Sequence, residues 1–118
     1  MCWSWKSTGW VFCAIKLSEA MIVEAATFDI KPGSEAEFER QFEQAQLIIS
    51  QSRGYVSHKL YKGLETPGRY VLLVHWQTLE DHTEGFRGSP AFGQWRALLG
   101  PSFHTPPVVE HLELKYEM

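Results

Sequence analysis

The stretch RYVLLVHW, residues 69–76, decides the fold class of this chain. Apolar side chains occupy both alternating faces for most of its length, which indicates a strand covered by helices on one side and by another sheet on the other. A chain of 118 residues can cover only one face of a small sheet with its own helices. The second apolar face therefore predicts a partner chain, and we expect a homodimer.

Two strand patterns precede this run in the sequence. Residues 55–64 form a second strand candidate, and the Pro67-Gly68 pair between the two runs predicts a hairpin turn. Residues 21–30 alternate with a period of two and predict a first strand that ends at Lys31-Pro32-Gly33. The sequence therefore predicts two strands before residues 69–76, and the second of them is joined to that run by the hairpin turn.

Helix patterns separate these strands. Ser34 and Glu37 match a capping box, and the apolar residues that follow have the spacing of one buried helix face. They are Phe38, Phe42, Ala45, Ile48 and Ile49. We expect this helix to end near Gly54, as a C-cap glycine.

Two further helices and a last strand complete the pattern. Thr78 predicts the cap of a short helix, and Ser89-Pro90 predicts the start of another that buries Trp95. Residues 108–116 alternate as a final strand. The order is that of an α+β, ferredoxin-like β-α-β-β-α-β chain, with an antiparallel sheet and helices on one face.

The first 20 residues differ from the other 98, because three of the five tryptophans and both cysteines lie there. The apolar run at residues 10–15 is shorter than the roughly 7–15 residues of a secretory signal and far below the roughly 20 of a membrane span. We expect residues 1–20 to be an extension outside the core, either an added segment or a mis-assigned start. Residues 21–118 are then the single domain, and we expect a cytoplasmic protein without membrane contact.

Composition excludes several functions for residues 21–118. They contain no cysteine, which rules out a disulfide framework, Cys-ligated zinc and a cysteine nucleophile. Removing Lys6, Lys16 and Glu19 from the totals of 11 basic and 14 acidic residues leaves 9 against 13, a net charge of −4. An acidic domain without a basic run is not expected to bind nucleic acid. The five histidines lack the local spacing of a metal site, so we expect no metal.

Residues 21–116 resemble the antibiotic biosynthesis monooxygenase (ABM) family, in which two ferredoxin-like chains press their sheets together as a dimeric α+β barrel. The residues that carry the resemblance are Met21-Ile22-Val23, Pro32-Gly33, the run YVLLVHWQT at 70–78, and Ser89-Pro90-Ala91-Phe92. Members of this family oxidise polycyclic phenols to quinones, cleave haem, or have no assigned reaction. The quinone-forming type needs no flavin, haem or metal, so the resemblance to this type implies that no cofactor is bound.

The resemblance also implies site residues. Trp76 matches a tryptophan of both the quinone-forming and the haem-degrading branches, and Arg96 matches an arginine of the quinone-forming type. The haem-degrading branch is expected to have a histidine near position 96 and an asparagine near position 27. This chain has Arg96 and Thr27 there, so haem degradation is only the third hypothesis. Leu72 and His82 stand where quinone-forming relatives have an asparagine and a tyrosine, and His82 could replace the tyrosine as an acid–base group.

The first hypothesis is therefore a cofactor-independent monooxygenase for a planar aromatic or quinol-type small molecule. Trp76 would hold the ring, His82 would accept a proton, and Arg96 would stabilise the anion. The expected substrate-binding residues are Phe38, Phe42, Phe86, Phe92 and Thr27. The second hypothesis is a non-catalytic dimeric small-ligand-binding or stress-response barrel.

Each catalytic candidate also has a purely structural interpretation. Trp76 could be a core aromatic, Arg96 a solvated helix residue, and His82 an exposed histidine. His111 is interpreted only as a strand histidine, and Glu24 as an ordinary polar strand residue.

Overall fold

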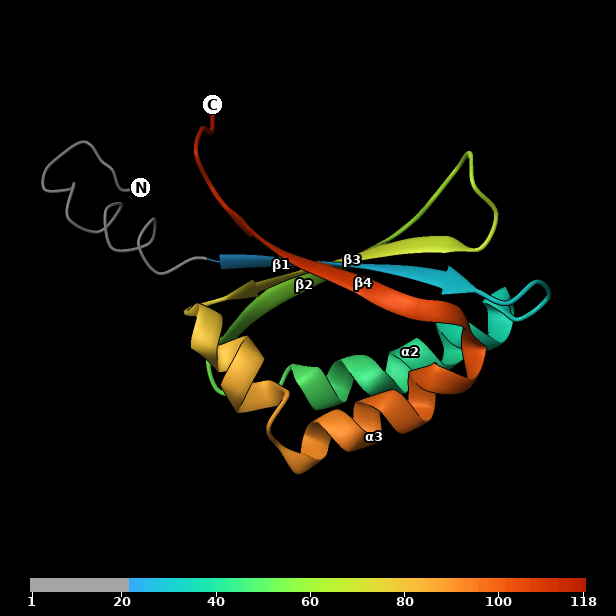
Figure 1. Ribbon diagram of the computed structural model, residues 1–118, viewed down its shortest axis with the longest axis horizontal. Coiled ribbons are helices and arrows are strands. Elements are labelled where there is room, and N and C mark those ends of the chain that lie inside the picture. The colour runs from blue at the N-terminus through green and yellow to red at the C-terminus, as the bar shows by residue number, and fades with distance from the viewer. Residues whose placement is uncertain (1–21) are drawn as a thin grey trace, which may run out of the picture.

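The computed structural model describes residues 22–118, so the expectation for residues 1–20 lies outside the described part of the chain. The elements, in chain order, are β1 (Ile22–Ile30), α2 (Glu35–Ile49), β2 (Tyr55–Lys62), β3 (Arg69–Trp76), the π-helix η1 (Asp81–Phe86), α3 (Pro90–Leu99), the short η2 (Gly100–Ser102) and β4 (Phe103–Glu113). Every pair of neighbouring strands is antiparallel, in the order β2-β3-β1-β4. Figure 1 shows α2 and α3 side by side on one face of the sheet, and the ferredoxin-like prediction is confirmed.

The face of the sheet under the helices forms the core. Alternate residues of β3, from Tyr70 to Trp76, are at most 1% exposed, as the period of a strand requires. Helix α2 buries Phe38 and Phe42 against them, and the Phe38 ring centre lies 4.7 Å from that of Tyr70. The predicted apolar face of this helix is therefore the one that packs on the sheet.

The other face of the sheet has no helix over it within residues 22–118 (Figure 1). The strand registers place apolar side chains from all four strands on this open face. They include Val23, Ala25, Tyr61, Val71, Leu73, Val108 and Leu112. Val108 is 65% exposed and Leu112 is 45% exposed.

Two details of α2 differ from the prediction. The Ser34 side chain makes no capping hydrogen bond. The Glu37 carboxylate accepts hydrogen bonds from Arg40 and, at 2.7 Å, from Gln41, while the Ser34 amide donates to the Lys31 carbonyl. The capping box is therefore wrong, although the helix does begin directly after Ser34. The helix also ends at Ile49, before Gly54.

The turn between β2 and β3 closes back on β1. Gly68 has a φ of 81°, and its carbonyl oxygen accepts a hydrogen bond of 2.8 Å from the Ile30 amide. A Cβ atom at position 68 would lie 2.8 Å from the Ile30 carbonyl oxygen. This position therefore requires glycine for both its dihedral angle and its space.

No helix within residues 22–118 is long and apolar enough to cross a membrane.

Candidate active site

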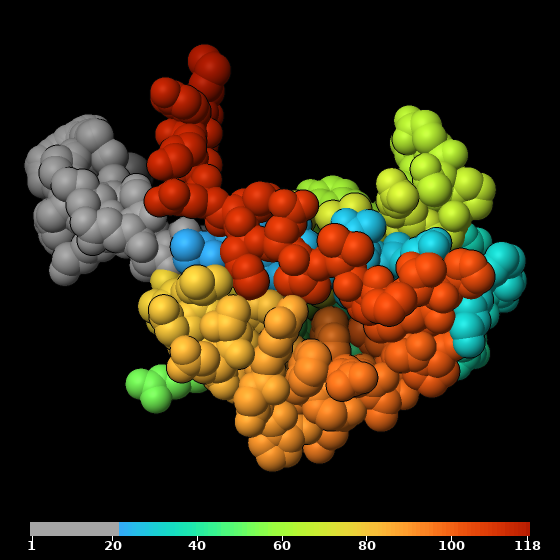
Figure 2. All heavy atoms as spheres, in the orientation of Figure 1, coloured from blue at the N-terminus to red at the C-terminus, as the bar shows by residue number. Residues whose placement is uncertain are grey.

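A cavity of about 780 Å³ lies between the sheet and the segment that contains η1 and α3. Figure 2 shows a hollow on this side of the molecule, between β4 and the helices. Its volume is in the range of sites that hold small organic molecules. The lining includes Glu24, His82, Phe86, Arg87, Phe92 and Arg96. The start of β4, residues 104–107, completes the wall.

The π-helix η1 places two residues of this wall. Thr78 Oγ1 accepts a hydrogen bond of 3.1 Å from the Asp81 amide at its start, and the Arg87 amide donates to the His82 carbonyl at 3.1 Å. This wider turn, with a bond between residues five apart, is a feature that recurs at functional sites. It buries both His82 and Phe86, each 2% exposed, against the sheet.

Helix α3 supplies the opposite, apolar and cationic part of the wall. The Phe86 and Phe92 rings meet edge to face, with centres 5.5 Å apart. The Arg96 guanidinium carbon lies 5.7 Å from the centre of the Phe92 ring, on the exposed side of the helix. In this part of the wall a flat aromatic ligand would therefore meet the Phe86 and Phe92 rings and the Arg96 cation.

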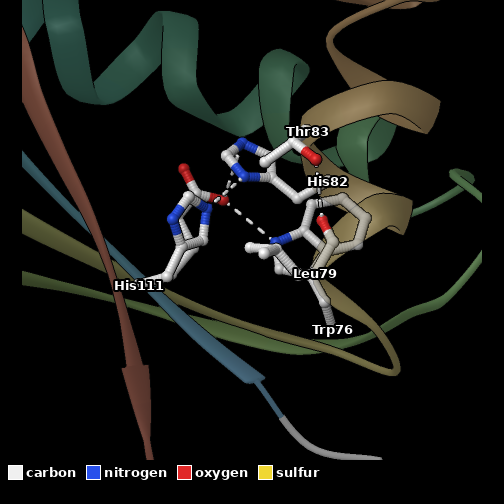
Figure 3. A network of polar contacts seen from close by, with 6 residues as sticks. Trp76, Leu79, His82, Thr83 and His111 are labelled. Atoms are coloured by element: carbon white, nitrogen blue, oxygen red, sulfur yellow. Dashed lines mark hydrogen bonds and ion pairs between the residues drawn. The ribbon is translucent and has the colours of Figure 1, made fainter.

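A set of polar groups lies where η1, β1, β3 and β4 meet. The Trp76 indole Nε1–H donates to Glu24 Oε1 at 3.0 Å, and His82 Nε2 lies 3.3 Å from the same oxygen. His82 Nδ1 lies 2.8 Å from His111 Nε2, and Figure 3 shows the His82, His111 and Trp76 side chains pointing toward one another. The His82 ring also stacks on Trp76, with centres 5.3 Å apart. We call Glu24, His82 and His111 the triad.

Burial controls the protonation of the triad. Glu24 is 6% exposed, and this burial raises its pKa, while the Trp76 hydrogen bond and the positive charge of Arg87 act to lower it. Burial also lowers the pKa of His82 to about 4, helped by Arg87 and His111. The pKa of His111 is lowered by burial and by Arg87. Both histidines are therefore neutral at pH 7.

The structure brings together some of the predicted site residues. His82, Arg96, Phe86 and Phe92 all line the one cavity. Trp76 is completely buried behind Glu24 and His82, outside the lining.

Besides Trp76, which was predicted to hold the ring, three predicted ligand contacts are not at the cavity. Phe38 and Phe42 are core residues outside its lining. Thr27 pairs with Val71 and Val108 on the open face, on the other side of the sheet. The expectation that His82 is exposed is wrong, because the π-helix turns its ring inward.

Sequence reasoning missed Glu24 and His111 as partners of His82. One signal was present for Glu24: it shares the alternation of Ala26 and Phe28, so the strand pattern places a carboxylate on the buried face. His111 had no such signal, because its closeness to His82 depends on the register that pairs it with Glu24.

Within residues 22–118, no group of three His, Cys, Asp or Glu side chains is arranged to hold a metal ion.

The fold is that of a small α+β, ferredoxin-like domain with a cavity beside its sheet. The family model for antibiotic biosynthesis monooxygenases matches residues 21–98. The chain belongs to the antibiotic biosynthesis monooxygenase family. It is 54% identical over 94 residues to YczJ, an uncharacterised protein of Bacillus subtilis (strain 168), a match that covers 79% of this chain and 98% of YczJ.

Solved structures agree on the fold. A crystal structure from Bordetella bronchiseptica that carries the same family name is 38% identical, with a TM-score of 0.80 over 82% of this chain and 99% of that one. SnoaB of Streptomyces nogalater, a cofactor-independent oxygenase, is 19% identical, with a TM-score of 0.70 over 84% of this chain and 97% of SnoaB. The likeness to SnoaB is one of fold alone.

Proposed function

We propose that this protein is a monooxygenase that oxidises a planar aromatic or quinol-type small molecule without a bound cofactor. One observation carries the proposal: a single cavity combines aromatic walls, the Arg96 cation and a buried acid–base pair, Glu24 and His82. A reaction of this kind needs a group that takes a phenolic proton and a cation that stabilises the anion, so that the anion passes an electron to dioxygen. Membership of the antibiotic biosynthesis monooxygenase family supports the same chemistry.

Each residue has a role that follows from its position. Phe86 and Phe92 hold the flat ring, and Arg96, above Phe92, pairs with the developing oxygen anion. Glu24 and His82, in contact with each other, form the acid–base pair of the wall. Trp76 acts as a positioning residue, because it fixes Glu24 by a hydrogen bond and His82 by stacking.

Oxygen consumption with a panel of anthrone- and hydroquinone-like compounds tests this function. We expect Arg96→Ala to lower kcat/KM by about 100-fold, the usual effect of removing one group that stabilises an oxyanion. Arg40→Ala is the matched control, since Arg40 is an exposed arginine of α2 that pairs with Glu37. Equal rates for wild type and Arg96→Ala would refute the assignment. Saturable binding of a panel compound without oxygen consumption would instead indicate a non-catalytic ligand-binding barrel.

We also propose that a second copy of the chain covers the open face of the sheet. The apolar residues of β3 on that face, Val71 and Leu73, lie between strands that add Val108 and Leu112. An apolar sheet face of this extent is typical of an interface rather than of a free surface. The dimeric barrel expected from the family resemblance is formed by this contact.

A further inference from the structure

We propose that the triad is a proton path that connects the cavity with solvent, with Glu24 as the group that exchanges a proton with the ligand and His111 as the outer end. This inference rests on the proposed function for its role in turnover, but the path itself is a property of the described residues. Glu24 and His82 line the cavity, whereas His111 does not and is exposed. The triad therefore has one end at the cavity and one end at the surface.

The contacts of His82 exclude it as the terminal base. Its Nε2 is 3.3 Å from Glu24 Oε1, and its Nδ1 is 2.8 Å from His111 Nε2. With both ring nitrogens occupied, His82 passes a proton on rather than taking one from the ligand. Glu24 has a second carboxylate oxygen and is itself part of the cavity wall, so it is the member that meets the ligand.

The hydrogen bonds require a definite tautomer at each ring when Glu24 is ionised. A carboxylate only accepts hydrogen bonds, so His82 must donate from Nε2 and accept at Nδ1. His111 must then donate from Nε2, which leaves its Nδ1 as an acceptor on the exposed side. Every donor in this arrangement points inward, toward Glu24.

One proton can then move along the triad without any ring leaving its place. Water protonates His111 Nδ1; the Nε2 proton of His111 goes to His82 Nδ1; and the Nε2 proton of His82 goes to Glu24. The net result is one proton moved from solvent to Glu24, with both histidines now protonated at Nδ1. The reverse sequence starts from this pair of Nδ1–H tautomers and returns a proton from Glu24 to water, and no electrons move in either direction.

The positive charges around the triad favour the neutral forms of His82 and His111, which are hydrogen-bonded in a row to the Glu24 carboxyl group. Arg87, which directly follows η1, acts on all three members. Arg96 of α3 and His104 of β4 are further titratable groups of the same cavity wall. Trp76 stabilises ionised Glu24 through its N–H. Because a neutral histidine donates at one nitrogen and accepts at the other, these surroundings keep both rings able to relay a proton.

Nitrogen-15 NMR of the histidine rings tests the path without any substrate. We expect both His82 and His111 to be Nε2–H tautomers while Glu24 is ionised, and both to change to Nδ1–H tautomers together as Glu24 takes up a proton. Glu24→Gln removes the titrating carboxyl and should abolish this joint change. His75 lies on the open face, outside the triad, and is the internal control. Independent tautomers for His82 and His111 would overturn the proposal.

Turnover with the quinol panel tests the use of the path. His111→Gln keeps an N–H donor toward His82 but cannot relay a proton, and we expect kcat to fall about 10- to 100-fold with KM unchanged. His111→Ala should be equally slow and should recover with millimolar imidazole. Glu113→Gln changes an exposed residue two positions along the same face of β4 and is the matched control. Wild-type kcat in His111→Gln would overturn the proposal.

The two experiments separate this inference from the proposed function. If wild type oxidises no compound of the panel, the oxygenase assignment fails, while the joint tautomer change still supports the proton path. If wild type turns over normally and the tautomers change independently, the path fails and the oxygenase assignment stands.

Discussion

The hydrogen bond from Trp76 to Glu24 joins the core to the candidate site. Trp76 is 0% exposed and donates its only side-chain N–H to a carboxylate that is 6% exposed. A buried carboxylate without a donor is costly, whereas one with two donors is stable. Trp76 is therefore both a core residue and a support of the site, so neither of the two separate interpretations from the sequence describes it fully.

Trp76→Phe should destabilise the fold more than the loss of ring area alone predicts. The phenyl ring can still pack against His82, but the Glu24 carboxylate loses a donor, which costs about 1–3 kcal/mol in the free energy of unfolding. Urea denaturation at pH 7.5 measures it. Trp95→Phe, at a second buried tryptophan outside the triad, controls for ring size. In a Glu24→Gln background the penalty should shrink, and an unchanged penalty would contradict the hydrogen bond as its cause.

His82 should make the fold sensitive to acid. Its pKa is about 4 in the fold against an ordinary 6.5, so between those values the unfolded chain binds more protons than the folded one. The free energy of unfolding should therefore decrease as the pH falls from about 6.5 to about 4. His82→Gln should flatten this decrease in urea titrations. The same slope in wild type and His82→Gln would contradict the prediction.

Glu24 should act in the opposite direction. Burial raises its pKa above the ordinary 4.5, so above pH 4.5, up to the raised value, the folded state binds more protons. Acidification through that interval therefore stabilises the fold and offsets part of the loss from His82. Glu24→Gln should be the more acid-sensitive protein over that interval in the same titrations. A shallower acid dependence in this variant would show that burial does not raise the pKa of Glu24 in the fold.

The elements could be predicted from the sequence because each has a local pattern. The period of two in β1, the apolar run on both faces of β3 and the helical spacing of Phe38 and Phe42 can each be recognised without knowledge of the partner element. The triad could not be predicted in this way, because its members lie 58 and 29 positions apart. Their contact depends on the pairing of Glu24 with His111 and on the wider turn of η1. Neither leaves a local signature.

The β2–β3 turn provides a stability test at the level of an element. Gly68→Ala should lower the free energy of unfolding by about 3 kcal/mol, because it combines a positive φ with a Cβ atom against the Ile30 carbonyl oxygen. Gly33→Ala is the matched control: it has a φ of 84° with no atom within 4 Å of its Cβ position. It should cost only about 1 kcal/mol. Equal losses in thermal denaturation would show that the contact with Ile30 contributes nothing.

The open face provides a test for the whole molecule. Sedimentation equilibrium at micromolar concentration should give the mass of two 13.6-kDa chains. Val108→Glu places a charge on the open face and should yield the monomer, because a charge buried between two apolar sheets is strongly disfavoured. Leu47→Glu, at a similarly exposed position on α2, should remain dimeric. A monomeric wild-type protein would contradict the proposed partner.

Strand β4 contributes residues both to the open face of the sheet and to the triad, so it could couple binding at the open face to binding in the cavity. His111 faces the helix side, while its neighbours Glu110 and Leu112 face the open side, because successive strand residues point in opposite directions. A molecule that binds the open face and shifts β4 would therefore change the distance between His111 and His82. Thermodynamic linkage then makes the effect reciprocal: occupation of the cavity would alter the affinity of one copy for the other. In the proposed dimer, the two identical cavities would be joined through two such edge strands and would respond to a ligand as a coupled pair rather than independently.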